Sequence, residues 1–195
     1  MKKGVFFILA IVALALLFSG AVLAQNVGDS SYYFVTYYSN NVSGAPDATL
    51  RFVNDGYTGG NIAADIYVLD DSQELVACGA CWITPDGILS EDVKTELTNN
   101  TLTGKVPPRG VIKVIADSTG DPYLPFYVTE GLHGWATHIE RATPTSGAYS
   151  TTESLVDDAN LALGEITQLG ELCSYEQYLG SGRGTITCTP EDSDF

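Results

Sequence analysis

The fold is decided around one stretch of the sequence, Ile62-Ala63-Ala64-Asp65-Ile66-Tyr67-Val68-Leu69-Asp70-Asp71-Ser72-Gln73-Glu74-Leu75-Val76-Ala77. Its first half, residues 62–69, is rich in branched and aromatic side chains, which favour β-strands. The next three residues, 70–72, are typical of a tight turn, because short polar side chains form hydrogen bonds to the backbone of a turn. Residues 74–77 resume the strand pattern. The stretch therefore predicts an antiparallel β-hairpin.

Further short strands flank this hairpin on both sides. They are predicted at residues 31–38, 48–53, 82–84, 88–90, 111–115, 135–139 and 149–155, with residues 93–97 continuing the strand at 88–90. Turn residues separate them at intervals of roughly 8–12 residues, which is the spacing of a β-sandwich. Strands do not alternate with helices, so a parallel α/β fold is not expected. The predicted fold class is mainly β, an antiparallel β-sandwich.

The pattern changes after Asn160. Apolar residues then recur at the helical intervals of three and four, at Ile166, Leu169, Leu172 and Cys173. A glycine at position 180 is a typical helix end. Residues 185–188 are predicted as a short final strand. We therefore expect one C-terminal helix, in an appendage to the sandwich that covers about residues 160–190.

The first 24 residues have the three parts of a secretory signal peptide. Lys2 and Lys3 form the charged part, residues 5–18 are apolar, and Val22-Leu23-Ala24 supplies the small residues of a cleavage site. An uncleaved anchor is the alternative, but the apolar run is shorter than the ~20 residues of a membrane span. We expect a signal peptide over residues 1–24 and a single secreted domain over residues 25–195.

The chain is strongly acidic, with 24 acidic and 9 basic residues and a formal charge of −15. Cleavage after Ala24 removes two lysines, so the mature chain is more acidic still. Nucleic acids and anionic membrane surfaces both need a basic binding surface, which this composition does not supply. No apolar run after the signal approaches the length of a membrane span. We expect no nucleic-acid partner, no membrane span in the mature chain, and a secreted, periplasmic or cell-surface location.

The cysteines are the most informative residues. There are four of them, Cys78, Cys81, Cys173 and Cys188. An even number in an exported chain predicts disulfides, because the compartment is oxidising. We favour the pairs Cys78–Cys81 and Cys173–Cys188, since these partners are close in sequence, while the crossed pairings stay open. A zinc site and a redox-active Cys-x-x-Cys are lesser alternatives, because the second pair is widely spaced and the first lies between strands.

Neighbouring carboxylates occur in several predicted loops, at residues 70–71, 117 and 121, and 157–158. None has the Asp-x-Asp-x-Asp-Gly spacing of a dedicated Ca²⁺ loop. Asp117 and Asp121 are nevertheless our candidate Ca²⁺ ligands, and Ca²⁺ is the one cofactor we consider. Turn formation and solubility explain the same residues more simply.

No catalytic signature is present. His133 and His138 are five residues apart, and odd spacing in a strand places side chains on opposite faces. The glycine-rich residues 180–184 match neither a nucleophile elbow nor a phosphate loop. We therefore expect no catalytic residue and no enzymatic activity. A hydrolase that uses paired carboxylates is the alternative.

An aromatic strand opens the mature chain. Its candidate assembly residues are Tyr32, Tyr33, Phe34, Val35, Tyr37 and Tyr38. In the simpler interpretation they form a strand of their own sheet, buried on one side. In the other, the strand inserts into the open sheet edge of a second copy and builds a filament. Tyrosine-rich surfaces also suit adhesion and carbohydrate stacking.

Two segments of the chain resemble a known group of proteins. One is residues 73–81 followed by residues 84–88, and the other is residues 171–173 with residues 180–184 and Cys188. Together they resemble exported bacterial proteins of unknown function with paired cysteines. The resemblance implies export and paired cysteines, and it implies no activity, ligand or catalytic residue.

The sequence thus favours a non-catalytic structural or adhesive protein of the periplasm or cell surface, with a self-assembling filament subunit as a variant. Its expected partners are other copies of the chain or cell-surface components. An extracellular carbohydrate- or Ca²⁺-binding module is the second hypothesis, and a carboxylate-dependent hydrolase is the third.

Overall fold

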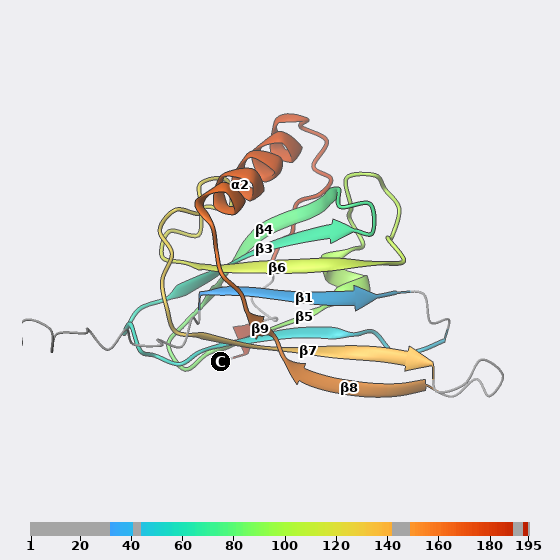
Figure 1. The fold of residues 1–195 in the computed structure, drawn as a ribbon, viewed down its shortest axis with the longest axis horizontal. Coiled ribbons are helices and arrows are strands. Elements are labelled where there is room, and N and C mark those ends of the chain that lie inside the picture. Colours follow the sequence, from blue (N-terminus) through green and yellow to red (C-terminus); the bar gives the residue numbers. More distant parts are fainter. Residues whose placement is uncertain (1–31, 41–43, 142–148, 189–192, 195) are drawn as a thin grey trace, which may run out of the picture. The chain divides into compact units, whose positions relative to one another are not determined.

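Two antiparallel sheets pack together, as the strand spacing predicted (Figure 1). The first sheet, here called sheet A, contains β4 (Leu75–Ile83), β3 (Ile62–Asp70), β6 (Arg109–Asp117), β1 (Tyr33–Ser39) and the two-residue β9 (Asp157–Asp158), in that order. Sheet B contains the two-residue β10 (Ser193–Asp194), β5 (Ile88–Asp92), β2 (Thr49–Asn54), β7 (Leu132–Arg141) and β8 (Tyr149–Leu155). The fold is therefore mainly β, with four long strands in each sheet.

The structure is a computed structural model that describes residues 32–40, 44–141, 149–188 and 193–194. The predicted signal peptide, residues 1–24, lies outside the described residues. Among the described residues, no helix has both the length and the apolar character needed to cross a membrane.

The main core lies between the two sheets. Alternation along β2 turns Leu50 and Phe52 inward, and both are almost completely buried. Phe52 meets Phe34 of β1 edge to face, with ring centroids 5.1 Å apart. Aromatic pairs in this geometry add to the stabilisation that burial of their area supplies. The apolar residues that alternate along β2 in the sequence are thus the ones that pack between the two sheets.

The predicted hairpin at residues 62–77 is confirmed, but its second strand is longer than predicted. β4 continues through Cys78 and Cys81 to Ile83, so the separate strand expected at residues 82–84 is the end of β4. The prediction that residues 93–97 continue a strand is wrong, because Val93–Leu97 form a π-helix, η1. The Asp47 carboxylate accepts hydrogen bonds from the amides of Lys94 and Thr95, which holds this turn in place.

A single long helix, α2 (Leu163–Tyr178), covers the outer face of sheet A. Figure 1 shows it over β4, β3 and β6. Leu169 and Cys173 of α2 pack with Tyr67 and Ile115 in a second, smaller apolar cluster on this face. The helix ends just before Gly180, whose positive φ of 63° suits a residue without a side chain. The predicted C-terminal helix is confirmed.

The chain after α2 returns along the edge of β4. The Cys78 amide donates a hydrogen bond to the Gly184 carbonyl, and the Ile186 amide donates one to the Cys78 carbonyl. Thr185 and Cys78 form a single parallel bridge, so the predicted final strand at 185–188 is one bridge long. A Cβ at Gly79 would lie 2.5 Å from the Ile186 carbonyl oxygen, which explains the glycine at this close approach.

The favoured disulfide pairing is wrong, and the crossed pairing is present. Cys78 bonds to Cys173 of α2, and Cys81 bonds to Cys188. The reason is the continuity of β4. Residues three apart in a strand point to opposite faces and lie about 10 Å apart, beyond the reach of a disulfide. The two bridges therefore join the C-terminal part to sheet A, and their presence indicates an oxidising, extracytoplasmic environment.

Candidate functional site

The loop after β6, residues 118–131, crosses the outer face of sheet A beside α2. Its conformation depends on Asp117, whose Oδ1 accepts hydrogen bonds from the amides of Thr119 and Gly120 at 2.6 and 2.9 Å. The Oδ2 of Asp117 accepts a third from the Tyr127 amide at 3.1 Å. The buried Tyr67 hydroxyl donates a hydrogen bond to the Pro122 carbonyl at 2.9 Å. The 118–131 loop is thus anchored to sheet A by buried polar groups.

An aromatic groove separates this loop from α2. Its lining residues are Tyr123, Leu124 and Phe126 of the loop and Thr167, Gly170, Glu171, Ser174, Tyr175 and Tyr178 of the helix, around a volume of about 520 Å³. A Cβ at Gly170 would lie 2.6 Å from the Tyr123 carbonyl oxygen, so this glycine lets the helix approach the loop closely. Tyr175 and Tyr178 are 60% and 86% exposed, which leaves their rings free to contact a ligand.

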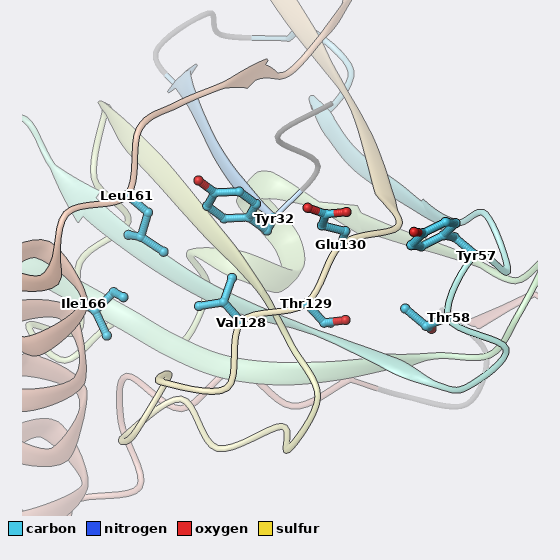
Figure 2. Close-up of a pocket in the computed structure, with 8 residues that line it drawn as sticks. All are labelled: Tyr32, Tyr57, Thr58, Val128, Thr129, Glu130, Leu161 and Ile166. Carbon is cyan, nitrogen blue, oxygen red and sulfur yellow. The ribbon is translucent and has the colours of Figure 1, made fainter. Parts of the chain in front are cut away.

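A second hollow lies on the other side of the same loop. It has a volume of about 550 Å³ and is lined by Tyr32, Tyr57, Thr58, Val128, Thr129, Glu130, Leu161 and Ile166. Figure 2 shows Leu161 and Ile166 at the end of the hollow near α2, and Tyr57 and Thr58 at the opposite end. Adjacent helix residues, Ile166 and Thr167, line the two hollows, so both adjoin the start of α2.

These hollows combine aromatic rings with hydroxyl and carboxylate groups. The polar side chains of the aromatic groove are Thr167, Glu171 and Ser174, beside the hydroxyls of its tyrosines. The residues that line it include no histidine, lysine or cysteine. Ligand sites of this size are typically apolar walls with a few polar groups that set orientation. The arrangement suits binding by stacking and hydrogen bonding.

The predicted Ca²⁺ ligands, Asp117 and Asp121, both belong to the anchored end of the 118–131 loop. Asp117 is fully buried, and Asp121 accepts a hydrogen bond from the Tyr123 amide at 3.0 Å. The structure brings a third carboxylate to them, that of Asp65 in β3. Burial first, and then the charges of Asp117 and Asp121, raise the pKa of the Asp65 carboxyl to about 8. Sequence reasoning missed Asp65, because it stands within an otherwise apolar strand.

A further buried acid lies under the helix. Glu176 is 5% exposed, its Oε2 lies 3.6 Å from Cys78 Sγ, and its Oε1 has no hydrogen-bond partner among the described residues. Burial raises the pKa of this carboxyl to about 7. A Cβ at Gly184 would lie 2.4 Å from Glu176 Oε2, so the returning chain closes over the acid.

The two histidines have different partners. His133 Nε2 lies 3.2 Å from Asp55 Oδ2 near the surface, while the buried His138 stacks on Tyr37 with ring centroids 4.0 Å apart. The four cysteines are all in disulfides, which leaves no thiolate for the zinc or redox alternatives. The glycine-rich residues 180–184 form the turn between α2 and the returning chain.

The aromatic strand lies within its own sheet. All seven residues of β1 pair with β6, and Phe34 and Val35 also pair with β9. Tyr33, Phe34 and Tyr38 are buried, whereas Tyr37 is 53% exposed. In the single chain, the aromatic segment therefore forms a strand of its own sheet. Insertion of this strand into a second copy stays a prediction.

Sequence reasoning did not single out the residues that line the aromatic groove. Tyr175 and Tyr178 are three apart on a helix, and this spacing is a signal that could have placed both rings on one face. Tyr123 and Phe126 carry no such signal, because their position depends on how the 118–131 loop folds. Comparison with protein-family models, curated proteins and solved structures finds no match to this chain. Function is therefore argued from the site alone.

Proposed function

We propose that the protein is a non-catalytic, extracytoplasmic attachment protein that binds carbohydrate in the aromatic groove. The observation that carries the proposal is the set of exposed rings between α2 and the 118–131 loop. Two tyrosines of the helix face this groove together with Tyr123 and Phe126 of the loop. Sugar rings present flat apolar faces that stack on aromatic side chains, while their hydroxyls need hydrogen-bonding groups at the rim.

The rim of the groove supplies such groups. Glu171 and Ser174 are exposed on α2, within the same lining as the tyrosines. A carboxylate accepts hydrogen bonds from sugar hydroxyls, and a serine hydroxyl both donates and accepts them. The formal charge of −15 works against polyanionic ligands, so neutral or cationic carbohydrates are the expected class.

An extracytoplasmic location supports an attachment role. Two disulfides fit an oxidising space, and residues 1–24 match a secretory signal. A secreted, periplasmic or cell-surface location is therefore part of the proposal. Export would bring the groove to the polysaccharides of a cell envelope or its surroundings.

The test is a binding screen of the mature chain against neutral and amino-sugar polysaccharides, followed by calorimetry with any oligosaccharide that binds. We expect Tyr175→Ala and Tyr178→Ala each to weaken binding by about tenfold, since stacking on one aromatic ring contributes roughly 1–1.5 kcal/mol. Tyr57→Ala is the matched control, because Tyr57 is 76% exposed and lines the other hollow. Absence of carbohydrate binding, or loss of binding only in Tyr57→Ala, would contradict the assignment.

A further inference from the structure

The side chain of Asp65 is fully buried and has no hydrogen-bond partner among the described residues. Asp65 lies in the middle of β3, two residues from Tyr67, on the outer face of sheet A that α2 and the 118–131 loop cover. Its exposed fraction is 0%, and neither carboxylate oxygen takes part in a hydrogen bond within the part of the chain that the structure describes. Burial of a carboxylate without partners is strongly unfavourable. The arrangement therefore points to a ligand that satisfies these oxygens.

Two more carboxylates lie close to Asp65. Asp65 pairs with Ile115 of β6, and Asp117 lies two residues further along that strand. Residues two apart in a strand share a face, so Asp65 and Asp117 lie on the same face of sheet A. Asp121 follows in the loop, and its charge, like that of Asp117, raises the pKa of Asp65. Three acids are thus gathered between sheet A and the loop.

Within the described ranges of the chain, no Lys, Arg or His forms an ion pair with this cluster. The ion pairs found among the described residues use other acids, namely Glu153, Asp71, Glu165 and Asp55. A hard divalent cation takes oxygen ligands and balances several carboxylates at once, and Ca²⁺ is the one that accepts irregular sites with six to eight ligands. Zn²⁺ prefers nitrogen and sulfur, which this cluster does not offer.

The carboxylate oxygens of Asp65, Asp117 and Asp121 do not all lie within 4.8 Å of one another in this structure. Among the described residues, the one set of three acidic, histidine or cysteine side chains whose ligand atoms all lie within 4.8 Å of one another is Cys81, Glu91 and Cys188. Two members of that set are bonded to each other as a disulfide, so it offers no metal site. At the aspartate cluster, water molecules or movement of the loop would complete the coordination of an ion.

We propose that Asp65, Asp117 and Asp121 bind one Ca²⁺ ion, which fastens the 118–131 loop to β3. Asp65 supplies buried oxygens that have no hydrogen-bond partner in the described part of the chain. The other two acids lie at the start of the loop. Tyr123 and Phe126 of this loop form one wall of the aromatic groove, so the ion holds that wall in position. Ca²⁺ binding itself is independent of the proposed function, and only its effect on carbohydrate binding rests on it.

The test is calorimetric titration of the metal-free full mature chain with CaCl₂, together with thermal unfolding in CaCl₂ and in EDTA. We expect one site with a Kd of about 0.1–1 mM, the range of extracellular Ca²⁺ modules, and a higher Tm with Ca²⁺. Asp65→Asn keeps the size of the side chain and removes its charge. It should weaken Ca²⁺ binding at least about tenfold, because affinity depends on the number of charged ligands.

Glu74→Gln is the matched control, since Glu74 is an exposed acid in the turn of the β3–β4 hairpin and should bind Ca²⁺ as the wild type does. If Asp65→Asn does not fold, Asp121→Asn, at a partly exposed position, replaces it in the same titration. A wild-type chain without saturable Ca²⁺ binding overturns the proposal. So does equal Ca²⁺ affinity in the wild type and the cluster variant, which would indicate binding to surface acids.

The same preparations separate this inference from the proposed function. Carbohydrate binding is measured in EDTA and in Ca²⁺, whereas the CaCl₂ titration contains no carbohydrate. Ca²⁺ binding without any carbohydrate binding would leave the ion site standing and refute the proposed function. Carbohydrate binding without saturable Ca²⁺ binding would support the proposed function and refute the ion site.

Discussion

The two faces of sheet A are covered in different ways. The inner face packs against sheet B through a large, continuous apolar cluster that includes Phe34, Phe52 and Ile66. The outer face is covered by α2 and the 118–131 loop, over a smaller apolar cluster. Beside that smaller cluster lie two buried acids, Asp65 and Glu176. Both oxygens of Asp65 and the Oε1 of Glu176 have no hydrogen-bond partner among the residues that the structure describes.

The inner face of sheet A stabilises the fold, whereas the outer face carries the hollows and acids that could bind a ligand. Apolar burial between the sheets is favourable without any ligand, because it removes hydrocarbon from water. Buried acids on the outer face are unfavourable unless something compensates them. Both hollows and the acid cluster also lie by the loop and helix that cover this face. The proposed binding surface therefore lies on the outer face, and the following changes test the contrast between the two faces.

The largest effect is expected from removing the bridge that holds α2 to sheet A. The Cys81–Cys188 bridge remains in the variant, so removing Cys78–Cys173 opens only the loop made of residues 78–81 and 173–188. Closure of a loop of about 20 residues is worth about 3–3.5 kcal/mol in the chain-entropy model. The double variant Cys78→Ala/Cys173→Ala should lose stability of this order in denaturant unfolding. Hydrogen exchange should show that α2 loses protection while β2 and β7 keep theirs.

The second bridge provides the control for that experiment. With Cys78–Cys173 intact, Cys81→Ala/Cys188→Ala opens the same short loop of residues 78–81 and 173–188, so it should lose similar stability. Its loss of protection should appear in residues 184–188 rather than in α2. Equal loss of protection throughout both sheets in either variant would mean that the two layers do not open separately.

The next effect concerns the inner face. Phe52 is 0% exposed and packs edge to face on Phe34. Phe52→Ala should lower the free energy of unfolding by about 3 kcal/mol, because it removes buried area and leaves a cavity. The loss should affect both layers together, since this core joins the sheets. Tyr57→Ala, at an exposed ring, is the control and should leave the unfolding midpoint in urea nearly unchanged.

The smallest of the three effects depends on pH. Burial raises the pKa of Glu176 to about 7 from its usual 4.5, so the folded state holds this proton more strongly than the unfolded state. The contribution of the protonated Glu176 carboxyl to the free energy of unfolding is therefore fully present below pH 4.5 and is lost as pH rises through 7. Glu176→Gln removes the penalty and should be more stable than the wild type by about 2 kcal/mol at pH 8.

Urea unfolding of Glu176→Gln and the wild type from pH 4 to 8 measures this difference. The advantage of the variant should vanish near pH 4. Glu171→Gln removes an exposed acid of the same helix and controls for the loss of one charge. A constant difference between Glu176→Gln and the wild type across the pH range would show that Glu176 is not held in its acid form.

Much of the fold could be predicted from local patterns. The hairpin at residues 62–77, the alternating strands and the helix before Gly180 depend on nearest-neighbour spacing, which is visible in one sequence. The error at residues 93–97 has a tertiary cause, because the carboxylate of Asp47, far away in sequence, holds that turn. The strand boundary near Cys78 failed for a similar reason, since pairing with β3 continues β4 through Cys78 and Cys81 to Ile83.

The candidate site was less predictable than the fold. Asp117 and Asp121 were recognisable as neighbouring acids in one loop, but Asp65 joins them only through the pairing of β3 with β6. Tyr123 and Tyr175 are far apart in sequence and line the same groove. Contacts of this kind are set by loop closure and packing, which a local pattern does not contain.

By itself, the sequence determined the alternation that makes strands, the turn chemistry between them, the helical spacing after Asn160 and the strongly acidic composition. The tertiary structure decided the disulfide partners, because the faces of β4 direct Cys78 to α2 and Cys81 to the returning chain. It also decided which acids are buried and which aromatic rings share a groove. Periodicity is a property of neighbouring residues, whereas pairing and burial depend on segments that meet only after folding.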